Sequence, residues 1–220
     1  MNHMPLRSLT GVAQVRRPTQ RALAKQRTRE KILASAKALI VEKGYDGATI
    51  RDIAAAAGMS TGAVFASFTD KSDLFGEIIV ADRDALYEAM EAAADQATHE
   101  GAPVDAALQA VFEAGLEFHF ADLPLLQATM AAAWSSELGP QVRTRLGRRP
   151  VTEVIAGAIG AAIERGELSP KADVSLLSQM LWDGYLANFR RTPSQAWGIE
   201  ALRARLKEQI AIILASSREG

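Results

Sequence analysis

Apolar residues recur at helical spacing along most of the chain. In the first such stretch they lie at Ile32, Leu33, Ala36, Leu39 and Ile40. This spacing predicts a helix from near residue 25 to residue 43, ended by the glycine at 44. Strict alternation of apolar and polar residues, which would indicate strands, is absent, and helix-forming residues dominate. The sequence therefore predicts an all-α protein.

The same spacing predicts a series of helices after residue 70. They cover residues 71–96, 104–120, 123–135, 141–165 with an interruption near Pro150, 172–191 and 199–215. Glycine and proline occur in most of the intervals between them. We expect three parts: an arm over residues 1–25, a three-helix unit over 26–70 and a larger helical unit over 71–220.

Residues 49–68 have the pattern of two short helices joined by a tight turn. Thr49 and Asp52 have the spacing of a capping box, so a helix should begin at residue 50. Gly58 can adopt the left-handed conformation that ends a helix, and Ser60 is a good N-cap for the next one. This arrangement is typical of a helix-turn-helix, whose second helix enters the major groove of DNA.

The second of these helices has an unusual outward face. Val64 and Phe68 lie four residues apart and should pack inward. Small and hydroxyl side chains then face outward or lie near the helix start, where a solvated helix would normally carry charges. Of these, Thr61, Ala63 and Ser67 are expected to lie nearest to base edges.

Several ordered segments of the N-terminal third match one known family. They are Thr-Arg-Glu-Lys-Ile-Leu at 28–33, Glu-Lys-Gly-Tyr at 42–45, Thr49 to Asp52, Ile53-Ala54, Ala57-Gly58, and Gly62-Ala63-Val64-Phe65 followed by Phe68, Lys71 and Leu74. From about residue 28 to 79, the chain thus resembles the DNA-binding domain of the TetR family of bacterial transcriptional regulators.

The resemblance implies a homodimeric regulator of transcription. Such a protein would be a repressor that binds a palindromic operator in double-stranded DNA and leaves it when a small, mostly apolar ligand enters the larger unit. The residues expected to contact DNA are Thr49, Arg51, Ser60, Thr61, Gly62, Ala63, Phe65, Ser67, Lys71, Arg16 and Arg17. The chain departs from the family at Phe65, where Tyr is usual, and at Ser67, where His or Tyr is frequent. Loss of the phenol hydroxyl removes one phosphate contact, which the arm could replace.

Charge is distributed unevenly along the chain. Residues 1–71 carry 12 Lys and Arg against 5 Asp and Glu, while the remaining 149 residues carry 13 against 21. A basic N-terminal third suits a polyanion, and the acidic remainder would be repelled by one. The arm cations, including Arg16 and Arg17, can contact phosphates or the minor groove; the alternative is a solvated, disordered tail. Lys71 lies in the first turn of its helix, where the helix dipole disfavours a cation, and a DNA phosphate would explain it.

The predicted helix over 172–191 is apolar on two sides. Trp182, Tyr185 and Phe189 lie on one side, and Leu177, Met180, Leu181, Gly184 and Ala187 lie on another. One side can serve the core, and the other needs a ligand cavity or a second subunit. The helix over 151–165 supplies a matching surface, so these two helices are expected to form a four-helix dimer interface. The alternative is that both sides are internal core.

A group of aromatic and apolar residues in the larger unit could line a ligand cavity. They are Phe112, Leu116, His119, Leu126, Met130, Trp134, Trp182 and Tyr185. Mostly apolar walls with a few polar groups are usual for small-molecule pockets. The same residues could equally be ordinary core, and their use as a pocket is implied by the family resemblance.

Other kinds of function find little support in the sequence. There are no cysteines, and His3, His99 and His119 lack metal-binding spacing, so no metal or cofactor is expected. No nucleophile elbow or nucleotide loop is present, so we do not expect an enzyme. No apolar run reaches the roughly 18 residues of a membrane span, and a cytoplasmic location is expected. The main alternative to a regulator is a helical, dimeric small-molecule-binding protein whose DNA-binding unit has degenerated.

Overall fold

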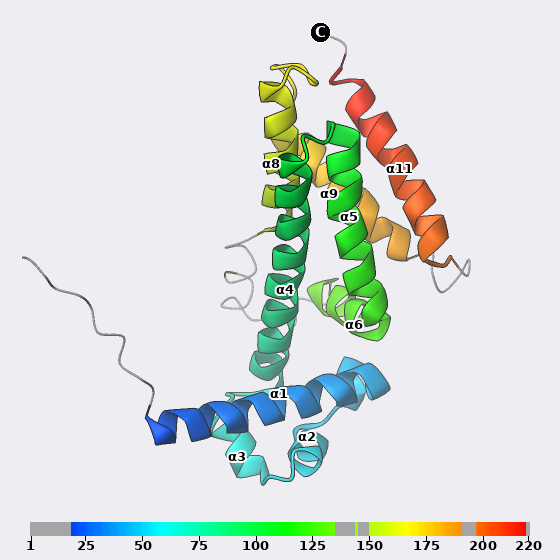
Figure 1. Ribbon diagram of the computed structural model, residues 1–220. Helices are drawn as coiled ribbons and strands as arrows, with labels where there is room; N and C mark the ends of the chain where they lie inside the picture. The colour runs from blue at the N-terminus through cyan, green and yellow to red at the C-terminus, as the bar shows by residue number, and fades with distance from the viewer. Residues whose placement is uncertain (1–18, 135–143, 145–149, 191–196, 219–220) are drawn as a thin grey trace, which may run out of the picture.

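The computed structural model describes residues 19–134, 144, 150–190 and 197–218. Within these ranges the chain forms α-helices and no strand, which confirms the all-α prediction. The helices are α1 (Gln20–Gly47), α2 (Ile50–Ala56), α3 (Thr61–Phe65), α4 (Lys71–His99), α5 (Val104–Ala121), α6 (Leu123–Trp134), α8 (Val151–Glu164), α9 (Val174–Phe189) and α11 (Ile199–Ala215). Figure 1 shows α1, α2 and α3 together at one end, with α4 leading from them along the other helices.

Helix α1 begins earlier than predicted. Thr19 caps it, because its Oγ1 accepts a hydrogen bond from the N–H of Ala22 at 3.2 Å. Residues 20–25 are therefore helical, and the predicted end of the arm at residue 25 was wrong. At its other end the helix is broken at Gly44, as predicted, where φ is 74°, but helical structure resumes up to Gly47.

The buried side chains form two clusters. The first, which we call the N-terminal core, combines α1, α2 and α3 with the first turns of α4, from Leu74 to Val80. The second, the C-terminal core, combines the rest of α4, beginning with Leu86, with α5, α8, α9 and α11. Because α4 belongs to both cores, the predicted division after residue 70 falls before the end of the N-terminal core.

Helix α6 also contributes to both cores. Leu125 is buried in the N-terminal core, whereas its neighbour Leu126 is buried in the C-terminal core. The helix packs against α1. An ion pair lies beside this contact, since Lys37 Nζ on α1 is 3.0 Å from Oδ2 of Asp122, the residue just before α6. The two cores are thus joined at α6 as well as along α4.

Candidate nucleic-acid interface and cavities

The start of α2 is fixed by the predicted cap. The N–H of Asp52 donates to Thr49 Oγ1 at 3.1 Å, and the Thr49 hydroxyl donates to Asp52 Oδ2 at 2.8 Å. This hydroxyl bond is the largest cause of a lowered pKa at Asp52. Ile53 and Ala54 turn into the N-terminal core, and Arg51 remains exposed. Gly58 has φ 64°, so it adopts the left-handed conformation expected between the two helices.

Helix α3 has the expected cap and the expected inward face. Ser60 Oγ accepts from the N–H of Ala63 at 3.2 Å, while Val64 and Phe68 are buried. Thr61 and Gly62 are exposed and Ala63 is half-buried. Phe65 is 55% exposed, which is unusual for a large apolar side chain. The outward face of α3 is therefore small, neutral and partly apolar.

Arg29 on α1 fixes the far end of α3, a role that the sequence motif did not reveal. Its Nη1 donates to the carbonyl oxygen of Ser67 at 2.6 Å, and its Nη2 is 3.2 Å from Glu77 Oε2 on α4. The guanidinium also lies over the ring of Phe68, 4.1 Å from its centroid. Ser67 is half-buried at this junction. Arg29 thus ties α1, α4 and the end of α3 together.

Lys71 has neighbours within the chain. Its Nζ donates to the carbonyl oxygen of Asp46 at 3.4 Å and lies 4.2 Å from the centroid of the Tyr45 ring. Tyr45 in turn packs against Phe75, with ring centroids 4.7 Å apart, which confirms the expected packing role of this tyrosine. The unfavourable position of Lys71 in the first turn of α4 is therefore partly balanced by the end of α1.

The basic arm is described only in part. Arg16 and Arg17 lie outside the described residues. The first turns of α1 present Arg21, Lys25 and Arg27 to solvent, and the first buried residue of the helix is Ile32. In Figure 1 these turns extend beyond α2 and α3. Positive charge thus continues from the arm along a projecting helix.

Some of the predicted cavity residues instead form a packed aromatic cluster. Tyr185 is fully buried, with ring centroids 5.3 Å from Phe112 and 5.2 Å from Trp182. Its Oη lies 2.6 Å from Nδ1 of His119, so the two side chains share a hydrogen bond. A Cβ added at Gly115 would lie 2.9 Å from that Oη, which shows how closely α5 approaches α9 here.

The chemistry of His119 follows from this environment. Burial, and then the nearby charge of Arg83, lower the pKa of His119 from 6.5 to about 4. Burial also raises the pKa of Tyr185 well above its usual value. Both side chains are neutral at pH 7. This agrees with the expectation that His119 is a buried side chain beside an aromatic run rather than a base.

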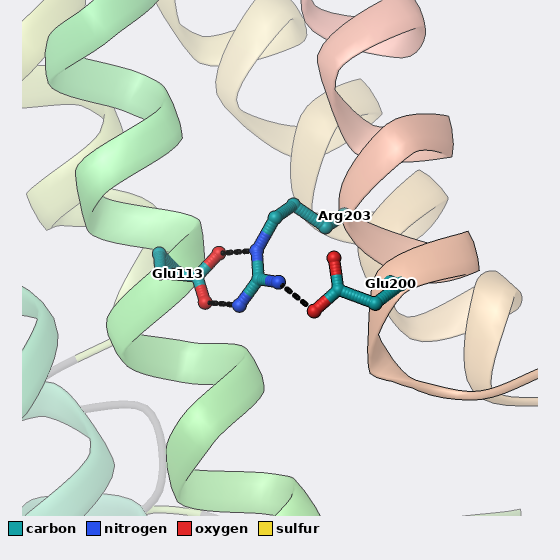
Figure 2. A network of polar contacts seen from close by, with 3 residues as sticks. All are labelled: Glu113, Glu200 and Arg203. Atoms are coloured by element: carbon teal, nitrogen blue, oxygen red, sulfur yellow. Dashed lines mark hydrogen bonds and ion pairs between the residues drawn. The ribbon is translucent and has the colours of Figure 1, made fainter.

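Two cavities contain other predicted residues. A cleft of about 610 Å³ between α5 and α11 has Phe112, Leu116, Leu206 and Ile210 among its lining residues. Arg203 crosses it, donating to Glu113 of α5 and to Glu200, as Figure 2 shows. A smaller cavity of about 160 Å³ is lined by Lys37, Asp82, Phe118, His119, Ala121, Asp122 and Leu126, so it lies where the two cores meet.

The predicted ligand residues therefore do not meet around one of these cavities. Phe112 and Leu116 belong to the larger cleft, and His119 and Leu126 to the smaller one. Trp182 and Tyr185 are packed in the aromatic cluster, and Met130 is half-buried against the C-terminal core. Trp134 ends α6, and its side chain lies outside the described part of the structure.

Much of the expected dimer surface is buried within the single chain. The large apolar side chains of α8, including Val151, Ile155 and Ile159, are buried within the single chain, as are Leu177 and Leu181 of α9. These side chains therefore pack within the chain, whereas Met180, another residue of the expected surface, is exposed; an interface on α8 and α9 stays a prediction. Exposed large apolar side chains lie instead at Leu176 (52%) and Met180 (45%) on α9 and at Ile212 (71%) on α11.

Two further features are absent from the part of the chain that the structure describes. The described residues contain no group of three or more His, Asp or Glu placed to hold a metal ion. None of the helices in the described ranges is long and apolar enough to span a membrane.

Comparison with known proteins gives matches at the level of family, sequence and fold. The model of bacterial regulatory proteins of the tetR family matches residues 32–78. The HTH-type transcriptional repressor BepR of Brucella suis is 30% identical over 159 residues, which are 70% of this chain and 75% of that protein. A protein of Mesorhizobium loti described as a TetR-family transcriptional regulator has a TM-score of 0.71 at 21% identity, covering 90% of this chain and 98% of that one. SmeT, the repressor of a Stenotrophomonas maltophilia multidrug efflux pump, has a TM-score of 0.66 at 23% identity, covering 88% and 91%.

Proposed function

Because this chain belongs to the TetR family of bacterial regulatory proteins, we propose that it is a homodimeric repressor released from a palindromic operator by a small ligand. The chain is a DNA-binding regulator of transcription and not an enzyme. The single observation that carries the proposal is the capped α2–turn–α3 unit, whose second helix presents Thr61, Gly62 and Phe65 outward instead of charged groups.

In the proposed complex, α3 reads base edges and the surrounding cations hold phosphates. Thr61 and Ala63 are short enough to let the helix approach the floor of the major groove. The exposed Phe65 ring suits the methyl group of a thymine, an apolar contact that a charged residue could not make. Arg51 and Lys71 would contact phosphates. The arm and the cations in the first turns of α1 would add further phosphate contacts.

We place the dimer interface on α9 and α11. Leu176, Met180 and Ile212 are exposed in the single chain, and a two-fold axis would let this face pack against its own copy. Burying these side chains would remove apolar surface from water, the main favourable term in subunit association. Two recognition helices related by such an axis would meet half-sites about 34 to 36 Å apart, or a multiple of that distance.

Ligand control would begin in the C-terminal core. The cleft between α5 and α11 has a volume within the usual range for small molecules, about 300 to 1,000 Å³. Movement of α5 or α6 would be passed to α1 through Leu125 and the Lys37–Asp122 ion pair, and to α3 through α4. For release, the ligand must bind the conformation with low DNA affinity more tightly than the other one.

Fluorescence anisotropy with labelled DNA from upstream of the protein's own coding region tests the proposal. The wild type should bind this DNA specifically. Thr61→Ala should reduce the specific affinity, whereas Thr98→Ala, an exposed threonine near the far end of α4, should leave it unchanged. A DNA-binding unit that has degenerated would instead show equal, weak affinity for this DNA and for a scrambled duplex.

A further inference from the structure

Arg83 is a partly buried positive charge beside the C-terminal core. The side chain belongs to α4 and is half-buried. Its guanidinium carbon lies 5.6 Å from the centroid of the Trp182 ring on α9. Its Nε is shielded from solvent and has no hydrogen-bond partner. A cation in this position is costly unless an anion accompanies it, because burial removes its hydration.

Other arginines on the helices have such an anion. Arg29 pairs with Glu77 at 3.2 Å, Arg203 with Glu113 and Glu200 (Figure 2), and Arg205 with Glu208 at 3.4 Å. None of the ion pairs formed among the described residues includes Arg83. Arg205 also has a buried Nε without a partner, but its guanidinium reaches a carboxylate. Arg83 differs because none of the described carboxylates pairs with it, and its guanidinium lies over the ring of Trp182.

The polar groups near Arg83 do not supply the missing negative charge. His119 and Tyr185 bond to each other and are neutral at pH 7, since the pKa of His119 is lowered and that of Tyr185 is raised. Asp82 precedes Arg83 but lines the small cavity with Lys37 and Asp122. Burial lowers the pKa of Arg83 itself, in keeping with an uncompensated charge.

We propose that Arg83 binds the carboxylate of a small organic acid whose apolar body packs beside Trp182. This assignment rests on the proposed function, names the chemical class of its ligand, and places the acid beside α4 and α9, at a site separate from the cleft between α5 and α11. A guanidinium can bind a carboxylate through two parallel hydrogen bonds, and the aromatic surface next to it suits an apolar body. The carboxylate of the acid would supply the negative charge that the Arg83 guanidinium lacks.

The position of Arg83 connects ligand binding to DNA binding. It lies three residues after Val80, the last α4 residue in the N-terminal core, and three before Leu86, the first in the C-terminal core. Neutralising the charge of Arg83 changes how favourably this side chain of α4 packs on Trp182 of α9. An organic acid would therefore act directly on the helix that carries the signal.

The first test uses the melting temperature of the protein without added ligand. Arg83→Met keeps much of the side chain's length and removes its charge. We expect the variant to melt about 2 to 4 °C higher than the wild type, which corresponds to relief of an uncompensated charge. Arg205→Met, the matched control, should not melt higher, because it breaks an existing ion pair. A lower melting temperature for Arg83→Met would overturn the proposal, since Arg83 would then already be balanced within the chain.

The second test compares acids with their own alcohols. Octanoate with 1-octanol and benzoate with benzyl alcohol are added to each protein, and the melting temperature is measured. We expect at least one acid to stabilise the wild type more than its alcohol does, and Arg83→Met to lose this preference with an affinity for the acid about tenfold lower or more. Arg205→Met should keep the preference.

The remaining outcomes separate this inference from the proposed function. Equal stabilisation by acid and alcohol, or no acid that binds the wild type better than its alcohol, would overturn the role of Arg83 and leave the repressor proposal standing. Specific operator binding is measured in parallel on the same proteins. Its absence in the wild type would overturn the proposed function, and with it the regulatory meaning of Arg83.

Discussion

Leu125 and Leu126 are adjacent in the sequence but buried in different cores. Leu125 packs among the side chains of the N-terminal core, and Leu126 among those of the C-terminal core. Both are almost completely buried, at 1% and 5% exposed. One turn of α6 therefore connects the DNA-binding helices to the larger helical part.

This arrangement predicts different effects of two equal truncations. Leu125→Ala and Leu126→Ala should each lower the free energy of unfolding by about 2 to 4 kcal/mol, because each leaves a cavity. Only Leu125→Ala loosens α6 from the N-terminal core, so it should change operator affinity more than Leu126→Ala does. Urea unfolding gives the first quantity and fluorescence anisotropy the second. Equal effects on operator affinity would contradict a coupling role for Leu125.

Lys71 is expected to serve both the fold and DNA. Lys71→Met retains an apolar stem over Tyr45 but removes the charge. The slope of log affinity against log salt concentration should become shallower by about one phosphate contact. Lys207→Met on α11 is the matched control and should leave the slope unchanged. If Lys71→Met lowers stability while the slope stays the same, Lys71 acts only on Tyr45 and the Asp46 carbonyl.

His119 should make stability depend on pH in a defined window. The ring binds a proton in the unfolded chain below about pH 6.5 but in the folded chain only near pH 4. Its contribution to stability is therefore complete above pH 6.5 and is lost as the pH falls towards 4, by roughly 2 to 3 kcal/mol between pH 7 and 4.5.

Urea unfolding at these two pH values checks this prediction. His119→Gln should show a smaller loss of stability on acidification than the wild type. His99→Gln removes an exposed histidine at the end of α4 and should behave like the wild type. The comparison between variants cancels the contributions of carboxylates that titrate in the same range. Identical pH dependence in all three proteins would show that the ring of His119 is solvated.

Single substitutions to glutamate can locate the dimer interface. Met180→Glu and Ile212→Glu should each shift the sedimentation coefficient from dimer to monomer, because each buries a carboxylate in the proposed α9 and α11 interface. Gly157→Glu places the same charge on the exposed side of α8, where a Cβ would meet no atom within 4 Å. We expect it to remain dimeric. If only Gly157→Glu dissociates the dimer, the interface lies on α8 and not on α9 and α11.

The helix-turn-helix could be predicted from the sequence almost completely. Its caps at Thr49 and Ser60 use side chains that bond to a backbone N–H three residues later, and its turn needs a positive φ at Gly58. Such interactions involve near neighbours in the chain, so they are visible as spacing. The ordered motifs around them also identified the family, which the comparisons confirm.

The dimer surface and the cavity residues were harder to predict. Periodicity indicates that Leu177 and Leu181 are apolar positions of a helix, but not whether they face their own chain or another. An aromatic residue such as Tyr185 has the same pattern in a packed cluster as in a cavity wall. Distinguishing these cases requires knowing which helices lie opposite.

By itself, the sequence determined the all-α fold, the start and end of most helices, and the DNA-binding unit, because local hydrogen bonds and helical spacing act over a few residues. Only the tertiary structure decided which core each leucine of α6 enters, that Arg29 fastens α3, and that Arg83 has no carboxylate beside it among the described residues. Those features depend on segments up to a hundred residues apart in the chain, whose meeting is fixed by packing of the whole molecule.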